Sequence, residues 1–298
     1  MSRNNWSLTT SLAALAVLGP IVCANAHGIK TSAADDEIDT EHIFGFVEGS
    51  DVGEKGELEG ELESSNDIGK HSGTYFANFN EAQLKYSMTD NFRMAPMLNF
   101  SYHNINNVPD LDNRNQFEFA GAGAEIRYRL LNWRTAPFGL TLSVSPNWAR
   151  RNEGTGEPVE QFGFELAALL DRELVKDRVF AAFNILYEPR WTRLTTTGTS
   201  EQKATLGFGG AIAIKIMPGI FVGGELLYLR AYESTGLDKF AGQAVFLGPT
   251  ANFKLSDRAN LTLAWNAQIA GKAVGDPNAF DLTNFERHQV LLRFGLTF

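Results

Sequence analysis

The last eleven residues of the chain, His288 to Phe298, alternate between two kinds of side chain. Counted back from the end, every second residue as far as Val290 is apolar, namely Phe298, Leu296, Phe294, Leu292 and Val290, and the interleaved residues are mostly polar or small. Successive side chains point to opposite faces only in a β-strand. The segment is therefore predicted to be a strand that separates an apolar environment from a polar one, and the chain stops on the apolar face.

The first 26 residues have the features of a secretory leader. Arg3 supplies positive charge, Leu12 to Val22 forms a short apolar core, and Ala24-Asn25-Ala26 is a small-residue cleavage site. The core is too short to span a bilayer. Cys23 is the only cysteine and would leave with the leader, so the mature chain is expected to contain no disulfide and no thiolate ligand.

Composition excludes several classes of protein. The formal net charge of −9 disfavours a nucleic-acid partner. The sequence after the leader contains no run of apolar residues long enough for a membrane-spanning helix. Glycine and phenylalanine are abundant, with 28 and 22 residues, and this balance suits strands with aromatic belts rather than a helical bundle.

Short polar turns recur about every 40 residues without any repeated motif, which argues against a propeller or solenoid. Longer loops rich in Asp, Asn and Gly alternate with these turns. Five turns and six loops make eleven connections and therefore twelve strands. The turns are Thr89–Asn91, Asn132–Pro137, Val175–Arg178, Met217–Gly219 and Ser256–Arg258; the loops are Ser64–Gly73, Asn104–Arg114, Arg151–Pro158, Thr195–Glu201, Glu233–Asp238 and Val274–Asn284.

The alternation of the last strand is repeated in the others. Between Phe138 and Trp148, for example, one face is apolar and the other carries Gly, Thr, Ser and Asn. A water-soluble β-sandwich also alternates, but its outer face would be strongly charged. We therefore predict an all-β, transmembrane, antiparallel up-and-down barrel of twelve strands over residues 57–298, with lipid outside and a polar lumen inside. An even strand number places both termini on the same side.

Residues 27–56 are predicted to form an N-terminal arm. The stretch from His27 to Glu41 is polar and acidic, as in a flexible periplasmic arm. The stretch that follows, Glu41 to Asp51, is too apolar for a free linker. It is expected to pack in the barrel mouth or at the periplasmic rim, although an extra short strand is the alternative.

The inward faces of the strands carry acids and bases in nearly equal number. One interpretation is an aqueous pore whose opposed charges orient solutes and set ion preference. The other is that the charges pair across a narrow lumen because buried charge must be compensated. The predicted pore-lining residues are Glu57, Glu59, Glu61, Glu63, Glu81, Lys85, Arg93, Glu125, Arg127, Arg129, Glu165, Arg190, Lys203, Glu225 and Arg293.

No motif for catalysis, metal binding or a cofactor is present in the sequence. It contains neither G-x-S-x-G nor H-E-x-x-H. Asp110 to Asn113 lacks the spacing of a calcium loop. His71, His103 and His288, in or near the loops, leave a hydrolase at the barrel rim as a remaining alternative. We therefore expect no enzymatic activity, no metal and no cofactor.

The strand pattern and the terminal Phe298 resemble outer-membrane barrels of Gram-negative bacteria. That resemblance implies an outer-membrane location, periplasmic termini, contact with lipid and lipopolysaccharide, and delivery by the assembly machinery through the C-terminal strand. The segment His42 to Glu57, with Phe44-Gly45-Phe46 and Glu48-Gly49-Ser50-Asp51, is similar to the putative meta-pathway phenol-degradation outer-membrane proteins. This second resemblance implies a role in transport of aromatic compounds.

The functional prediction is a channel or transporter for passive passage of small solutes through a mixed-charge lumen. The alternatives are a closed barrel that binds a partner through its loops, and the rim hydrolase. If the acids of the first strand line the pore, neutralising Glu57, Glu59, Glu61 and Glu63 together shifts ion selectivity toward anions.

Overall fold

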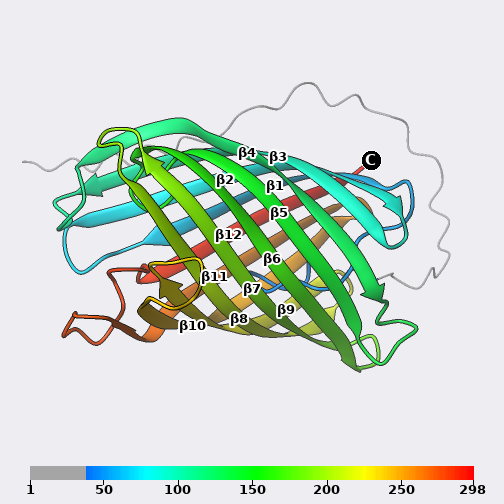
Figure 1. Cartoon of the computed structure of the whole chain (residues 1–298). Helices are drawn as coiled ribbons and strands as arrows, with labels where there is room; N and C mark the ends of the chain where they lie inside the picture. The colour runs from blue at the N-terminus through cyan, green and yellow to red at the C-terminus, as the bar shows by residue number, and fades with distance from the viewer. Residues whose placement is uncertain (1–37) are drawn as a thin grey trace, which may run out of the picture. The chain divides into compact units, whose positions relative to one another are not determined.

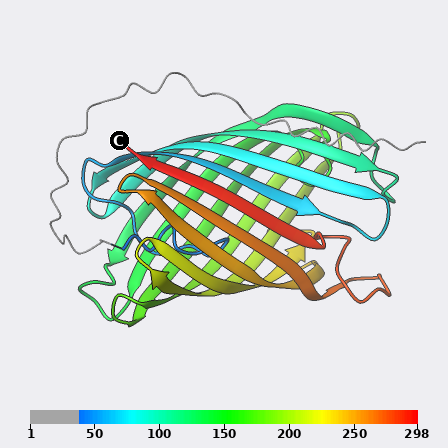
Figure 2. The ribbon, with the colours of Figure 1, turned by 180° about the vertical axis from the view of Figure 1, so that it is seen from behind.

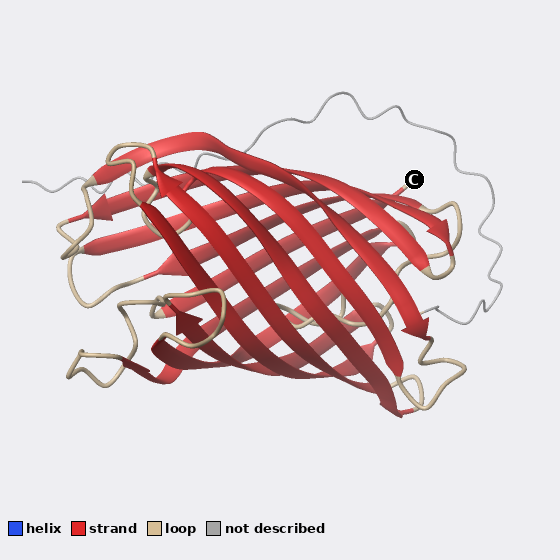
Figure 3. Cartoon of the chain, viewed as in Figure 1, coloured by secondary structure: helices blue, strands red, loops and turns tan. Residues whose placement is uncertain are grey.

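The computed structural model describes residues 38–298, so the predicted leader and residues 27–37 of the predicted arm lie outside the described residues. Within residues 38–298 no helix is long and apolar enough to cross a membrane. The regular structure there consists of strands (Figure 3). They are β1 (Leu58–Ile68), β2 (Thr74–Thr89), β3 (Phe92–Asn106), β4 (Arg114–Leu131), β5 (Gly139–Arg151), β6 (Pro158–Val175), β7 (Val179–Leu194), β8 (Ser200–Met217), β9 (Ile220–Tyr232), β10 (Phe240–Ser256), β11 (Ala259–Ala273) and β12 (His288–Thr297).

The strands form one closed barrel in which each strand is antiparallel to its neighbours in sequence (Figure 1). The first and last strands close it, with Leu62 opposite Phe294 and Glu63 opposite Arg293. On its other side β1 pairs with β2, which places Glu63 opposite Glu81. The predicted all-β class, twelve strands and antiparallel order are confirmed.

The connections divide between the two ends of the barrel. We call one the short-turn end; it carries the turns 90–91, 132–138, 176–178, 218–219 and 257–258. The long-loop end carries the loops 69–73, 107–113, 152–157, 195–199, 233–239 and 274–287. One of the two-residue turns is Pro218-Gly219, where Gly219 has a φ of 73°, a conformation that glycine adopts without strain.

The first strand differs from its predicted bounds. It was expected to end at Glu63 and to be followed by a loop from Ser64, but β1 continues to Ile68 and pairs with β12 and β2 throughout. The residues Ser64 to Asp67, near the end of β1, are polar on both faces of the strand. Hydrophobic alternation therefore disappears before the strand does.

The two faces of the wall have the predicted character. Leu98, Leu142 and Trp265 point outward and are 47% to 50% exposed, and many large apolar residues of the other strands are exposed as well. Thr262 and Asn266, on the inward face of β11, are completely buried although they are polar. Apolar surface outside and buried polar groups inside are the reverse of a soluble protein and match a barrel in lipid.

Residues 38–56, which we call the inner segment, lie inside the barrel at its short-turn end. Figure 2 shows them as a dark blue trace within the ring of strands, ahead of β1. They contain no strand and no helix, only turns and bends. Their peptide groups bond to inward side chains of distant strands, including Asn184 of β7 and Thr262 of β11.

Candidate functional site: the lumen and its inner segment

One side of the lumen is apolar, and the inner segment packs against it. Phe180 of β7 and Phe246 of β10 point inward among buried alanines. Phe44 and Val47 of the inner segment join this cluster, and all four side chains have no exposed surface. Complete burial of such a side chain contributes about 1.5–3 kcal/mol. The apolar contacts alone therefore favour a segment that stays inside the barrel.

The inner segment approaches the wall so closely that glycine is required on both sides of the contact. A Cβ at Gly45 would lie 2.5 Å from the Cβ of Ala264 on β11. A Cβ at Gly209 on β8 would lie 2.8 Å from Cγ2 of Val47. Both distances are shorter than carbon–carbon contact permits. Small residues on the inner face of the wall thus make the space that the segment occupies.

The opposite side of the lumen is charged, and Glu41 of the inner segment lies at its centre. Nζ of Lys85 lies 2.8 Å from the Glu41 carboxylate. The Arg93 guanidinium donates to both Glu41 oxygens, at 2.5 and 2.7 Å, and Arg127 lies 3.3 Å away. All four side chains are buried. One carboxylate of the segment therefore bonds to cations from three strands, β2, β3 and β4.

Two further acids of the inner segment extend this pairing. Glu48 bonds to Arg127 and, at 3.1 Å, to Arg293 of β12. Asp51 accepts a hydrogen bond of 2.8 Å from Arg129 at the short-turn rim. These are charge-assisted bonds, which are stronger than neutral ones. The charges of the wall are thus compensated to a large extent by the segment rather than only by one another.

His42 is the basic member of the segment. Its Nε2 lies 3.2 Å from a Glu59 oxygen, and its Nδ1 lies 3.6 Å from Glu61. The ligand atoms of these three residues are within 4.8 Å of one another, a spacing that permits a metal ion. However, Lys85 lies 2.7 Å from the same Glu61 carboxylate. Lys85 and His42 together supply the positive charge that a metal would bring. We therefore interpret these residues as a group of ion pairs and not as a metal site.

Acid is expected to loosen the inner segment. Burial raises the pKa of Glu48, but Arg127 and Arg293 outweigh it and lower that pKa from 4.5 to about 2. A depressed carboxyl pKa gives stability that is complete above 4.5 and is lost as the pH falls toward 2. We therefore expect open probability in planar bilayers to rise as the pH is lowered from 4.5 to about 2.

The alkaline side follows from His42. Burial alone would lower the pKa of His42, but the carboxylates of Glu59 and Asp39 outweigh it and raise that pKa from 6.5 to about 10. This contribution is complete below 6.5 and is lost as the pH rises through 10. We therefore expect open probability to rise again as the pH is raised through 10. A His42→Gln variant is the control, because it should lose this alkaline rise in open probability and keep the rise at acid pH. A flat pH profile of the unmodified protein would contradict both expectations.

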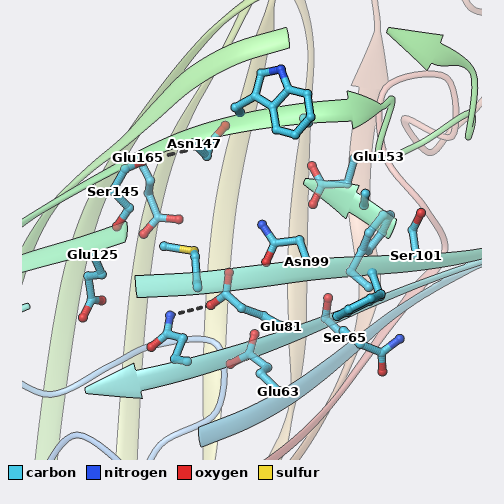
Figure 4. Close-up of a pocket in the computed structure, with 18 of the residues that line it drawn as sticks. Glu63, Ser65, Glu81, Asn99, Ser101, Glu125, Ser145, Asn147, Glu153 and Glu165 are labelled. Atoms are coloured by element: carbon cyan, nitrogen blue, oxygen red, sulfur yellow. Dashed lines mark hydrogen bonds between the residues drawn. The ribbon is translucent and has the colours of Figure 1, made fainter. Parts of the chain in front are cut away.

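On the long-loop side of the inner segment the lumen contains a cavity of about 300 Å³. Glu48 of the segment lines it at one end and Glu153 of the loop 152–157 at the other. Figure 4 shows Glu63 and Glu81 projecting from neighbouring strands into one space, with Glu165 on the far wall. The unfilled part of the lumen is thus lined mainly by polar groups.

The structure brings most of the predicted pore-lining residues together in two places. Glu81, Glu165 and Arg190 line the cavity. The larger group belongs to the ion-pair network around the inner segment, and some of its members also border the cavity. That group is Glu59, Glu61, Glu63, Lys85, Arg93, Glu125, Arg127 and Arg293.

The remaining predicted residues lie elsewhere. Glu57 and Arg129 are at the short-turn rim, ahead of β1 and near the start of the turn after β4. Glu225 accepts a hydrogen bond of 3.1 Å from the amide of Val47, and thus holds the segment. The Lys203 side chain is 61% exposed at the long-loop end, where it pairs with Glu201. As the lining of a conducting path, the whole set remains a prediction.

Two of the three histidines in or near the loops pack against other side chains of the barrel. His103 is buried, packs edge-on against Phe79 at 5.9 Å and contacts the Glu153 carbonyl at 2.7 Å. His288 stacks on Trp265. Among residues 38–298, neither ring hydrogen-bonds a hydroxyl or a carboxylate. Nε2 of His71, in the loop 69–73, lies 2.8 Å from the Asp276 carboxylate, but no hydroxyl of the described residues hydrogen-bonds this ring. The rim-hydrolase alternative requires a hydroxyl nucleophile beside the histidine.

Two features of the lumen were missed by reasoning from the sequence. The first is the apolar side, with its inward phenylalanines. The second is that the segment's own acids are the partners of the wall cations. The inner face of β8 carried a usable signal, because Gly207, Gly209, Ala211 and Ala213 are too small to fill a barrel interior by themselves.

The chain was compared with protein families, with curated proteins and with solved structures. A family model described as a family of unknown function (DUF6662) matches residues 36–298. The comparison with curated proteins finds no match. Among solved structures, an outer membrane channel from Pseudomonas putida F1 is similar, with 14% identity, a TM-score of 0.57, and coverage of 84% of this chain and 98% of that one.

Two porin structures are also similar in their strand arrangement. The NanC porin is 8% identical with a TM-score of 0.47, covering 80% of this chain and 98% of its own. The KdgM porin, solved in complex with disordered oligogalacturonate, is 9% identical with a TM-score of 0.43, covering 81% and 99%. At 14% identity, the likeness to the Pseudomonas channel concerns the barrel fold, which is that of outer-membrane barrels.

Proposed function

The chain belongs to this family of unknown function, and we propose that it is an outer-membrane channel for small solutes whose lumen the inner segment closes in the resting state. The observation that carries the proposal is the division of the lumen. Its short-turn half is filled by a segment held through non-covalent contacts, and its other half contains a polar cavity. A reversible closure next to an open space is what a gated path requires.

The polar lining favours a channel over a closed structural barrel. A barrel that serves only as a scaffold gains most stability from apolar filling, whereas buried ion pairs contribute little net stability. Here a chain of ion pairs runs from Glu41 through Arg127 and Glu48 to Arg293. In the alternative function the loops bind a partner, yet the connections at the long-loop end are short apart from 274–287. The lumen is therefore the stronger candidate.

The orientation follows as part of the same proposal. The first residue of β1 and the last residue of β12 both lie at the short-turn end, and Phe298 there is 66% exposed. In outer-membrane barrels the short turns face the periplasm. The inner segment then closes the periplasmic mouth, and the exposed terminal strand is available to the assembly machinery during insertion.

A disulfide that locks the inner segment to the wall tests the gate. A Cβ built at Gly209 lies 4.0 Å from the Cβ of Val47, which is within the range of a disulfide. The only natural cysteine, Cys23, is in the predicted leader. The Val47→Cys, Gly209→Cys protein is expected to be silent in planar bilayers when oxidised, and to regain the openings of the unmodified protein when reduced.

The Val47→Cys single variant is the control, because it carries a cysteine in the segment without the bond. Gly209→Cys alone is unsuitable, because its Cβ would lie 2.8 Å from Cγ2 of the retained Val47. Correct folding is checked by heat-modifiable migration on gels. If the oxidised protein conducts as the reduced one does, the inner segment does not gate the path. If neither the locked nor the unlocked protein passes ions or small sugars, the channel function itself is wrong.

A further inference from the structure

The cavity beyond the inner segment has a charge imbalance that the rest of the lumen lacks. Around the segment, acids meet Lys and Arg directly, as in the pair of Glu63 and Arg293 at 2.7 Å. In the cavity, Glu81 and Glu165 have no cation within ion-pair distance among the described residues. Glu153 and Glu188 share a single Arg190, at 2.9 and 2.8 Å. The cavity wall thus carries more carboxyl groups than cationic groups to pair with them.

The Glu81 carboxylate is held in place by neutral groups. Gln83 donates to one oxygen of Glu81 at 2.5 Å, and the amide of Asn99 reaches the other at 3.1 Å in its favourable orientation. Figure 4 shows Glu81 and Asn99 on adjacent strands facing the same space. A carboxylate oriented by amides but not neutralised is suited to accept a cationic ligand.

A second, independent feature points to a ligand. Ser101 lines the cavity, is only 2% exposed, and its hydroxyl has no hydrogen-bond partner. Buried polar groups in native proteins are almost always bonded, so an orphan hydroxyl next to a cavity marks the place of a missing partner. A hydroxyl both donates and accepts, and it therefore suits an ammonium or a hydroxyl group of a solute.

The spacing of the acids distinguishes between kinds of cation. Within residues 38–298, the groups whose ligand atoms lie within 4.8 Å of one another all include His42, and none of them consists of cavity residues. No three acids of the cavity are therefore close enough to enclose one bare metal ion. Separated carboxylates in a space of about 300 Å³ fit an extended molecule with its positive charges several bonds apart.

We propose that the cavity is a binding site for small organic cations, of which an aliphatic diamine is the simplest case, and that such cations are the solutes the channel admits. This inference rests on the proposed function and names its substrate class. Glu81 and Glu165 supply the opposing charges, and Ser101 supplies a neutral contact. Anionic solutes are repelled by the same wall.

Calorimetry on the folded, full mature protein in detergent tests the site. The probe is 1,4-diaminobutane, compared with 1,4-butanediol, which has the same length without charge, and with succinate, which has the opposite charge. Only the diamine is expected to bind. Glu81→Gln and Glu165→Gln should each weaken binding roughly tenfold, the loss of one charge-assisted contact.

Glu160→Gln is the matched control, because Glu160 lies on β6 like Glu165 but has a largely exposed side chain outside the cavity. It should bind the diamine as the unmodified protein does. Equal binding of diamine and diol, or an unchanged affinity in the Glu81→Gln, Glu165→Gln protein, would overturn the assignment.

Transport is measured separately, by uptake of labelled diamine into proteoliposomes. Binding without uptake supports the site and contradicts the channel. Uptake of neutral solutes without selective diamine binding supports the channel and contradicts the site. The two failures are thus distinguishable.

Discussion

Deleting residues 38–54 is expected to raise the single-channel conductance of the refolded protein severalfold. The deletion removes the side chains that fill the short-turn half of the lumen, including Phe44 and Val47, and leaves Leu58 to begin β1. A barrel of this strand number has an interior wider than the filled eight-stranded type, so an unfilled lumen should pass ions continuously. The measurement is conductance in a planar bilayer, with single-channel steps compared with those of the unmodified protein.

The deletion also removes part of the barrel's apolar cluster, so a milder variant guards against misfolding. In Gly45→Val a side chain would clash with Ala264, because even its Cβ would lie 2.5 Å away, and the wall itself is unchanged. This variant should migrate as a folded barrel and show more frequent openings. If both proteins fold and conduct no more than the unmodified one, the lumen is blocked elsewhere and the inner segment is not its closure.

Replacing Glu41 with Ala is expected to shift the balance between closed and open lumen by two to three orders of magnitude. The substitution removes the carboxylate that Lys85, Arg93 and Arg127 share, so the three buried cations keep Glu61, Glu125 and Glu48 as their nearest acidic partners. Removing one partner of a buried ion pair costs about 3–5 kcal/mol, and each 1.4 kcal/mol is a factor of about ten. The cations regain water only when the segment leaves, so the variant should be open for most of the recording.

Glu54→Gln serves as the matched control, because Glu54 is exposed near the end of the same segment and has no ion pair among the described residues. Its gating should be unchanged. Glu48→Gln should have a smaller effect than Glu41→Ala, since the Glu48 side chain is 24% exposed. Unaltered open probability in Glu41→Ala would show that these ion pairs do not hold the segment.

The barrel was predictable from the sequence because its signal is periodic. Each strand that crosses lipid must be apolar on one face, and this requirement produces an alternating pattern of apolar residues in the sequence, as in Leu261 to Ile269 of β11. Beyond the bilayer this requirement ends. The polar residues Ser64 to Asp67 of β1 therefore lack the alternating pattern, and the sequence predicts a loop there. Closure of the barrel then placed Glu63 beside both Arg293 and Glu81.

The inner segment had no such signal. Its path is set by complementarity with the wall, such as Gly45 against Ala264, and not by any period of its own. Its apolar character indicated that it packs somewhere, but the partners of Glu41 come from three strands that only the closed barrel brings together. The pairing between the wall and the inner segment can therefore be recognised only in the folded structure.

This arrangement changes the experiment that the sequence alone suggested. Neutralising the acids of the first strand was expected to shift selectivity toward anions. Glu59 and Glu61, however, lie against His42 and Lys85 beneath the inner segment. Their loss would weaken the closure as well as change the lumen charge. Selectivity is better tested at Glu81 and Glu165, which line the open cavity.

The inner segment and β1 are one continuous chain, so the closure behaves as a ligand on a tether. Residues 53–57 separate the anchored part of the segment from the first strand. Short flexible tethers give a local concentration in the millimolar range. A free peptide with the sequence of residues 38–54 would have to reach such concentrations to silence the deletion variant. Rebinding in the intact protein is unimolecular, so each opening should be brief and its duration independent of the amount of protein in the membrane.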